Sequence, residues 1–292
     1  MHNDHSNSVR LDLHCHTTWS SGFTSPIGLV HQASLSDIPI LAITDHHTTA
    51  GYREASEEAH AVGVTLIPAI ELDCWYEGRR ADLLGYWIDP DHPRLTALLQ
   101  RWPSGIGQLL SDDLFYRSLN TLLPSPLTPA NIKSVPSSEA QTLFMLMRLL
   151  VQHGFAPTLG QAFQRFHNLQ QAGILERTPH HYVSVEEATQ TLRAAGGIVT
   201  LAHPALIRND DIVRNLVDSG LIDALEAPYT SYWTDKDAKN QRYAALAEET
   251  GLARTAGSDY HAYPHSTTQL GVDVEEALWN TLLNLKRVRY SR

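Results

Sequence analysis

Histidine and carboxylate residues recur in this sequence at the ends of apolar, strand-like runs. The first cluster is the pair His14 and His16, which closes the run LDLHCHT over residues 11–17. Residues two apart on a strand point to the same side, so both imidazoles can reach one metal ion. Cys15 lies between them and should point to the opposite side, where it would pack in the core.

Four more such clusters follow later apolar runs. They contain the residues Asp45, His46, His47, Glu71, His203, Asp259 and His261. Imidazole nitrogens and carboxylate oxygens suit Mn, Fe or Zn, whereas a structural zinc site would need a cysteine cluster. A carboxylate such as Glu71 can bridge two cations, and two cations about 3.5–4 Å apart can share a hydroxide and clamp the oxygens of a phosphoryl group. The pattern therefore predicts a multi-metal hydrolase.

The composition limits the class of protein and its partners. The chain has 292 residues, of which 42% are hydrophobic, and this is enough for one α/β barrel or two smaller domains. Its net charge of −10 argues against non-specific binding to duplex nucleic acid, which needs many Lys and Arg side chains. We expect a small-molecule substrate, and the oligomeric state stays open.

Membrane and export signals are missing from the sequence pattern. No apolar run reaches the ~18 residues of a membrane span. The polar stretch from Met1 to Arg10 lacks the apolar segment of a secretory signal. The two cysteines, Cys15 and Cys74, make no disulfide framework, which fits a reducing compartment. These features predict a cytoplasmic protein without membrane contacts.

The elements that must position the clusters alternate between strand and helix in the first third of the chain. Strands are predicted over 9–13, 38–44 and 64–70, and helices over 26–35 and 49–61. Ser25 followed by Pro26 is typical of a helix start, with an N-cap and then Pro at the first helical position. Residues 72–76 and 81–88 predict a hairpin.

The alternation stops in the middle of the chain and then resumes. Residues 89–182 show no strand pattern, and helices are expected at 142–152 and 161–170. A capping box at 184–187 opens the last third, with strands at 198–202, 224–227 and 252–256 and a closing helix at 275–287. We predict an α/β barrel formed by residues 1–90 and 183–292, with a helical insertion over 91–182. All clusters then fall at the carboxyl ends of strands, where barrel enzymes carry their active sites.

In their order along the chain, these motifs resemble those of the PHP family, named for polymerase and histidinol phosphatase. The matching segments are HCHT at 14–17, TDH at 44–46, IE at 70–71, LGY at 84–86, AHP at 202–204 and GSDYH at 257–261. The resemblance covers most of the chain outside the insertion. It is greatest to stand-alone bacterial members, which are nucleotide phosphatases and 5′-to-3′ RNA exonucleases. It implies a distorted seven-stranded (β/α) barrel with up to three metal ions.

The resemblance also implies a ligand set. The first ion would be held by His14, His16, Glu71 and Asp259. The second would be held by Glu71, Asp82 and His203. The third would be held by His46, His261 and the residue at the Asp position of an SDG motif. Asp45 would orient a ligand or a proton.

Three positions depart from the family pattern. Ser21 stands at the Asp position of SDG, so the third site loses its anionic ligand and two metal ions are expected in place of three. Asp82 stands where the family usually has histidine, and its harder oxygen favours Mn or Mg over Zn. His47 follows the TDH motif, where the family has an acidic residue or Asn. It could be a replacement ligand, a proton donor or an ordinary loop residue.

The insertion departs further. Nucleotide-acting relatives carry a Ser/Thr-Arg-x-His segment that helps to hold phosphate, and residues 138–141 stand in its place here. Glu139 would repel the anion that an arginine holds, and Gln141 replaces the histidine. Arg148 is left as a candidate phosphate contact. Tyr229 could stack on a nucleobase or belong to the core.

The function favoured by these residues is hydrolysis of a small phosphate ester by metal-activated hydroxide, with a nucleotide as the substrate that the resemblance implies. His261, His46 or His47 would protonate the leaving oxygen. A second hypothesis is a barrel of the same family that cleaves an amide, ester or C–N bond of a less anionic molecule. A third is a metal-binding module without catalysis.

Overall fold

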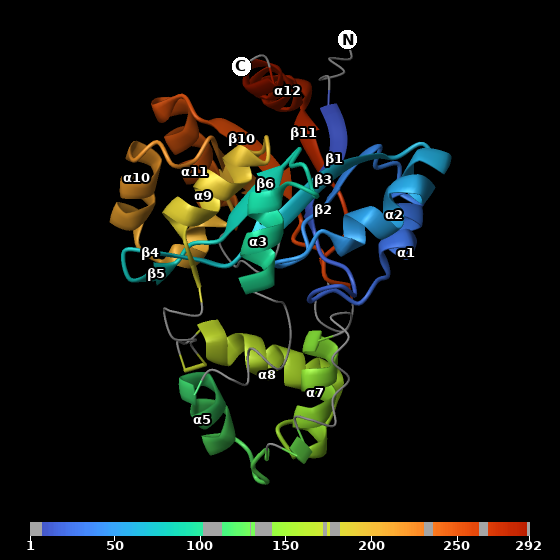
Figure 1. Ribbon diagram of the computed structural model, residues 1–292, viewed down its shortest axis with the longest axis vertical. Helices are drawn as coiled ribbons and strands as arrows, with labels where there is room; N and C mark the ends of the chain where they lie inside the picture. Colours follow the sequence, from blue (N-terminus) through green and yellow to red (C-terminus); the bar gives the residue numbers. More distant parts are fainter. Residues whose placement is uncertain are drawn as a thin grey trace, which may run out of the picture.

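The computed structural model describes residues 8–101, 113–128, 130–131, 142–171, 174–175, 182–230, 236–262 and 268–290. Figure 1 shows two parts: a sheet flanked by helices, and a separate group of helices that contains α5, α7 and α8. The first described strand, β1 (Ser8–Cys15), and the last described helix, α12 (Glu276–Tyr290), begin or lie at the end of the sheet part that faces away from this helical group (Figure 1).

One eight-stranded sheet forms the first part and curves towards closure. Its order is β10-β9-β8-β6-β3-β2-β1-β11. The strands are β1 (Ser8–Cys15), β2 (Ile40–Ile43), β3 (Thr65–Leu72), β6 (Leu83–Tyr86), β8 (Ile198–Leu201), β9 (Ala224–Tyr229), β10 (Ala253–Gly257) and β11 (Val272–Glu275). A bridge between Cys15 and Tyr260 links the end of β1 to the residues after β10. The sheet is thus an almost closed barrel, which confirms the predicted α/β barrel class, with eight strands in place of the expected seven.

Two strands of this sheet run antiparallel to their neighbours. Strand β6 runs antiparallel to both β3 and β8. The predicted hairpin is therefore split, because β4 (Cys74–Tyr76) pairs with the two-residue β5 (Arg79–Arg80) while β6 returns to β3. Strand β11 was not predicted, and it pairs antiparallel with β1. Antiparallel β6 brings its amino end, preceded by Asp82, to the edge where the parallel strands have their carboxyl ends.

Helices cover the sheet and begin where local sequence chemistry dictates. They are α1 (Pro26–Leu35), α2 (Ala50–Ala61), α3 (Pro93–Arg101), α9 (Val185–Ala194), α10 (Asp210–Asp218), α11 (Lys236–Thr250) and α12 (Glu276–Tyr290). Ser25 and Ser184 are the N-caps of α1 and α9, and their hydroxyls accept hydrogen bonds from Gly28 and Glu187. Each capping hydroxyl satisfies a backbone N–H that the helix itself leaves unpaired.

The helical group has a hydrophobic core of its own. It contains α5 (Asp113–Thr121), α7 (Thr142–Gln152) and α8 (Leu159–Gln171), whose buried side chains include Phe115, Leu150 and Phe163. Phe23, from the loop after β1, meets Phe163 edge-on at 4.9 Å. Leu95 and Leu98 of α3 pack with the barrel core instead. The predicted insertion boundary at residue 90 stays a prediction, and this packing favours a later one.

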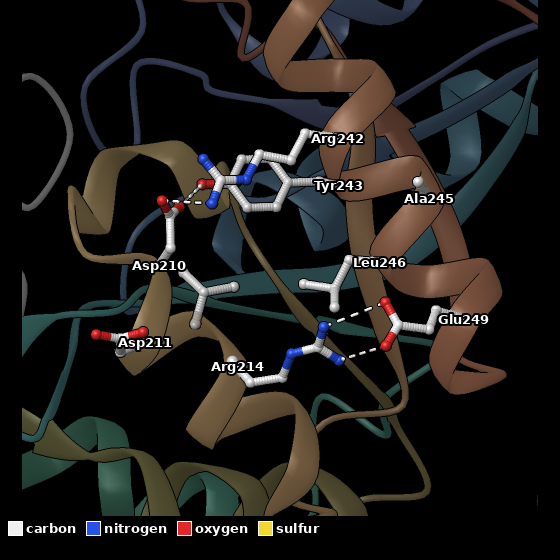
Figure 2. Close-up of a pocket in the computed structure, with 9 residues that line it drawn as sticks. Asp210, Asp211, Arg214, Arg242, Tyr243, Ala245, Leu246 and Glu249 are labelled. Atoms are coloured by element: carbon white, nitrogen blue, oxygen red, sulfur yellow. Dashed lines mark hydrogen bonds and ion pairs between the residues drawn. The ribbon is translucent and has the colours of Figure 1, made fainter.

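Several other features bear on sequence-based expectations. Cys15 and Cys74 are buried and free, and each packs in a hydrophobic cluster of the barrel. Among the described helices, none is long and apolar enough to cross a membrane. Figure 2 shows a pocket of about 320 Å³ between α10 and α11, where Arg214 pairs with Glu249 and Arg242 with Asp210. None of the predicted site residues lines it.

Candidate metal centre

The predicted ligands from β1, β3 and β10 meet at one edge of the barrel, and Glu71 lies at their centre. Its Oε2 is 3.3 Å from His14 Nε2 and 3.1 Å from His16 Nε2. Asp259, just after β10, places Oδ1 3.5 Å from His14 Nε2 and 3.1 Å from His16 Nε2. All four side chains are buried. The four residues expected to hold the first ion are therefore in mutual reach.

Two further histidines approach Glu71 from other strands. His203, after β8, places Nε2 3.2 Å from Oε1, the other oxygen of Glu71. His46, after β2, places Nδ1 3.3 Å from Oε2. Three groups of ligand atoms each lie within 4.8 Å of one another: His14, His16 and Asp259; His14, Glu71 and His203; and His16, His46 and His261. Glu71 Oε2 thus faces His14, His16 and His46, and Oε1 faces His203, an arrangement that a bridging carboxylate would have.

The donor set fits divalent cations. The buried atoms His16 Nε2 and His46 Nδ1 have no hydrogen-bond partner among the described residues, although both lie close to Glu71. Lone pairs that point at a common centre give this pattern of short distances without hydrogen-bond geometry. Two carboxylates and several imidazoles around one point also match the preferences of Mn, Fe and Zn.

The electrostatics of the centre favour a cation. Burial lowers the pKa of His16, but the carboxylates of Asp259 and Glu71 raise it to about 9 overall. The pKa of His14 is also raised, because Glu226, Glu71 and Asp259 outweigh burial. Burial raises the pKa of Glu71, yet His46 and His14 hold it well below its ordinary value. Positive charge is thus strongly stabilised between these side chains.

Glu226 is a functional residue that sequence reasoning missed. Its Oε1 is 2.9 Å from His14 Nδ1, and its Oε2 accepts the backbone N–H of His203 at 2.7 Å. With Nδ1–H donated to Glu226, the His14 lone pair is left on Nε2, which faces Glu71. The signal was present, since Glu226 is an acidic residue inside the apolar strand β9 and is itself buried.

Asp45 is linked to the candidate ligand His16 through Ser20. Asp45 Oδ1 accepts hydrogen bonds from the Ser20 hydroxyl at 2.6 Å and from the backbone N–H of Thr17 at 2.7 Å. The Ser20 oxygen in turn lies 3.3 Å from His16 Nδ1. This chain places a proton on His16 Nδ1 and leaves Nε2 for a cation. Asp45 is a positioning residue in this geometry.

Ser21 contacts the residue that was expected to share its metal site. Its hydroxyl lies 2.8 Å from His261 Nε2, and His261 Nδ1 lies 2.9 Å from the backbone oxygen of Asp259. The Nδ1–H group donates to that oxygen, so Nε2 accepts the Ser21 proton. The third group therefore combines three imidazoles with one hydroxyl and contains no carboxylate among its members.

Asp82 is buried beside His203 but is also held by an arginine. Its Oδ2 is 3.8 Å from His203 Nε2, consistent with a place at the second site. Arg80 Nε and Nη2 contact the two Asp82 oxygens at 2.8 and 2.7 Å, and Nη2 also lies 3.2 Å from Asp73. Neither Arg80 nor Asp73 was named from the sequence. Arg80 lies on the two-residue strand β5 and Asp73 lies between two strands, so neither residue belongs to a periodic sequence pattern.

His47 packs against Asp73 and does not face the centre. Its ring Nε2 accepts a hydrogen bond from the backbone N–H of Asp73 at 3.1 Å. The backbone N–H of His47 donates to the backbone oxygen of Glu71. The residue has φ +54°, a conformation that is costly for a side chain of this type. Of the three roles that the sequence left open, this geometry favours a loop residue.

The predicted substrate contacts are less well placed. Tyr229 ends β9 and is buried, and its hydroxyl donates to Asp259 Oδ2 at 2.8 Å. It is 5.6 Å from the His203 ring and belongs to the wall of the centre. Arg148 is exposed on α7. Glu139 and Gln141 lie outside the described residues.

The barrel and its edge of histidines and acids define a metallohydrolase-type protein, and comparison with known proteins gives the family. The model of the PHP domain matches residues 12–258. A 5′-3′ exoribonuclease of Haemophilus influenzae is 31% identical over 91% of this chain and 94% of the relative. A 3′,5′-nucleoside bisphosphate phosphatase of Chromobacterium violaceum is 26% identical, with 87% and 88% covered. The chain belongs to the PHP family, which confirms the resemblance drawn from its motifs.

A solved structure agrees with the fold. It is that of a candidate metal-dependent phosphoesterase from Bifidobacterium adolescentis, which aligns with a TM-score of 0.71 at 24% identity. The alignment covers 94% of this chain and 95% of the other. The likeness includes the helical group, because almost the whole chain is matched.

Proposed function

We propose that this protein is a metal-dependent phosphoesterase that hydrolyses a small phosphate ester, with nucleotides as the preferred class. The observation that carries the proposal is the convergence of His14, His16, Glu71, Asp259 and His203 at one buried point. Relatives named for RNA and nucleoside bisphosphate substrates support the choice of a nucleotide.

The proposed ligands divide around Glu71. His14, His16 and Asp259 would hold one divalent cation, and His203 with Asp82 would hold a second, with Glu71 shared between them. We propose Mn, Fe or Zn as the metal. Bound cations of this kind supply an activated water and stabilise charge on the phosphoryl oxygens.

The remaining residues prepare the ligands and move protons. Glu226 and Asp45 fix the tautomers of His14 and His16, in the latter case through Ser20. His261 is the proposed proton donor to the leaving oxygen, once its Nε2, which accepts a hydrogen bond from the Ser21 hydroxyl in this structure, has taken up a proton. His47 is tied to the backbone of Asp73 and is poorly placed for that step.

The test is metal removal followed by a substrate screen. Protein stripped by a chelator should lose its hydrolase activity and regain it with Mn²⁺ or Zn²⁺. The screen should compare nucleoside monophosphates, a nucleoside bisphosphate and short RNA with amide and ester substrates. Asp259→Asn is the inactive control, since it removes a carboxylate from the first site. Turnover of amides but not of phosphate esters would replace the proposal with the second hypothesis.

The state of the two cysteines bears on the location of the protein in the cell. We propose a cytoplasmic protein, because both cysteines are buried and free rather than paired. Fractionation of cells that produce the native protein would test it.

A further inference from the structure

A closed ring of acidic and basic side chains runs from Glu71 around one side of the metal centre and back. Acidic and basic members alternate along it. In order they are Glu71, His46, Asp73, Arg80, Asp82 and His203. The successive contacts measure 3.3, 3.0, 3.2, 2.7, 3.8 and 3.2 Å, the last one closing the ring at Glu71. Arg80 is the member of this ring that carries a permanent positive charge.

Arg80 contacts two carboxylates of the ring, those of Asp82 and Asp73. It binds both oxygens of Asp82 through Nε and Nη2, which is the fork geometry that guanidinium and carboxylate form best. The same Nη2 reaches Asp73. The side chain of Asp82 is 3% exposed and that of Asp73 is 12% exposed, whereas Arg80 is 41% exposed. The arginine therefore covers two buried carboxylates from the solvent side.

Those carboxylates need a cation. Two buried, unpaired acids next to Glu71 would be strongly unfavourable, because burial removes their hydration and like charges repel. The cation can be a side chain or a divalent ion. In this chain the ring contains Arg80, whose charge cannot be removed by deprotonation.

We propose that Arg80 is a built-in cation of the metal centre, which neutralises Asp73 and Asp82 in place of a divalent ion and weakens the binding of the second ion. Two effects act in the same direction. Arg80 occupies both oxygens of Asp82, and its charge lies one carboxylate away from His203 and from His46. The inference rests on the proposed function only in assuming that the centre binds metal.

The neighbouring residue Arg79 provides a matched control. It lies on the same two-residue strand β5, pairs with Tyr76 in the ladder and is exposed. Arg79→Gln removes the same charge at nearly the same place in the chain without touching the ring. An effect of overall charge would appear in both variants, whereas an effect of the ring would appear only with Arg80.

The experiment is a titration of metal-free protein with Mn²⁺. Binding is monitored in two ways, by calorimetry and by the electron paramagnetic resonance signal of free Mn²⁺. Arg80→Gln should tighten the weaker binding step by at least about tenfold, because a unit charge this close to a divalent cation changes binding by more than that factor. Arg79→Gln should stay within about twofold of the wild type, as expected for an exposed charge. Arg80→Lys keeps the charge but not the fork, so it should give a smaller tightening.

The double variant Arg80→Gln with Asp82→Asn identifies the source of the gain. If the freed Asp82 carboxylate creates the gain, the Mn²⁺ affinity of the double variant should return to within about threefold of the wild type.

Equal or weaker Mn²⁺ binding in Arg80→Gln, or the same gain in Arg79→Gln, would overturn the proposal. Should Arg80→Gln fail to fold, as judged by circular dichroism, unchanged binding in Arg80→Lys would overturn it as well. No substrate is used, so absence of phosphoesterase activity would count against the proposed function alone.

Discussion

The two sides of Glu71 use the same residue type, histidine, in opposite electrostatic settings. On one side His14 and His16 face Asp259, and Glu226 lies behind His14. On the other side His46 and His261 face His16 and the hydroxyl of Ser21. We call these the Asp259 side and the Ser21 side. On the Asp259 side both histidines have carboxylates at their Nε2 atoms, whereas on the Ser21 side Glu71 and Asp73 contact Nδ1 of His46 and the Nε2 atom of His261 meets a hydroxyl.

The difference shows that histidine spacing alone does not define a metal site. Neutral imidazoles bind a divalent ion, but binding at a buried site is tighter when a carboxylate offsets the charge of the ion. The Asp259 side meets this condition. On the Ser21 side the serine hydroxyl also donates to His261 Nε2, so it competes for the atom that a metal would use. We expect the Asp259 side to fill first and the Ser21 side to stay empty or partly filled.

The largest expected effect comes from the residue that both sides share. Glu71→Gln should remove more than one equivalent of bound metal and nearly all turnover, because each Glu71 oxygen contacts a different set of histidines. Elemental analysis and steady-state kinetics measure both. Glu57→Gln, the same substitution at an exposed position of α2, is the control. Near-normal metal content in Glu71→Gln would show that the two sides do not meet at this carboxylate.

Adding a side-chain carbon at Gly257 should damage the Asp259 side selectively. A Cβ on Gly257 would lie 2.3 Å from His14 Cβ and 2.8 Å from Glu226 Oε1. Gly257→Ala should therefore displace His14, lower the affinity for the first metal at least about tenfold and destabilise the fold by about 1–3 kcal/mol, the usual range for overpacking. Calorimetric metal titration and denaturant unfolding are the measurements.

A second glycine separates strain from loss of the site. Gly63 has φ +76°, and an added Cβ would meet no atom within 4 Å. Gly63→Ala should cost about 1 kcal/mol through its backbone conformation and leave metal binding unchanged. If both glycine variants bind metal like the wild type, close packing of Gly257 against His14 is not what positions the ligand.

The sequence was sufficient to predict which candidate ligands meet at the strand ends but not the residues that support them. His14, Glu71, His203 and Asp259 were found because each follows an apolar run, and parallel strands bring such ends together. Glu226 was missed because it lies inside its strand, where a single acid gives no spacing pattern. Its role depends on contacts with β1 and with His203, which are distant in sequence.

The fold shows the same division between local and non-local information. The starts of α1 and α9 were predicted because Ser25 and Ser184 each act on a residue three positions away. The pairing of β6 and the existence of β11 were not, because both depend on strands that fold against them from elsewhere. The Asp73–Arg80–Asp82 contacts follow from that pairing, so they were also beyond reach.

Adding a carboxylate to the Ser21 side should reduce the difference between the two sides. Ser21→Asp would place an anion beside His261, and we expect a third metal ion per chain and higher activity on phosphate esters, by a few-fold. Ser21→Asn is the control, since it has the same shape without the charge. Metal analysis after gentle purification decides the matter. Three tightly held ions in the wild type would mean that the Ser21 side binds metal without a carboxylate.

A pH dependence of stability and of metal affinity should belong to the Asp259 side. In the metal-free protein the pKa of His16 is raised from 6.5 to about 9, because the carboxylates of Asp259 and Glu71 outweigh burial. A pKa raised by folding contributes stability that is complete below about pH 6.5 and is lost as the pH rises through about 9. Unfolding in a chelator should therefore become easier over this interval.

Metal must displace the same proton, so its affinity should rise over the interval, by up to about tenfold per pH unit for each proton released. Asp259→Asn removes one of the two carboxylates and should flatten both trends, which thermal unfolding with and without Mn²⁺ would measure. Parallel trends in the two conditions would mean that His16 does not carry the proton that the cation replaces.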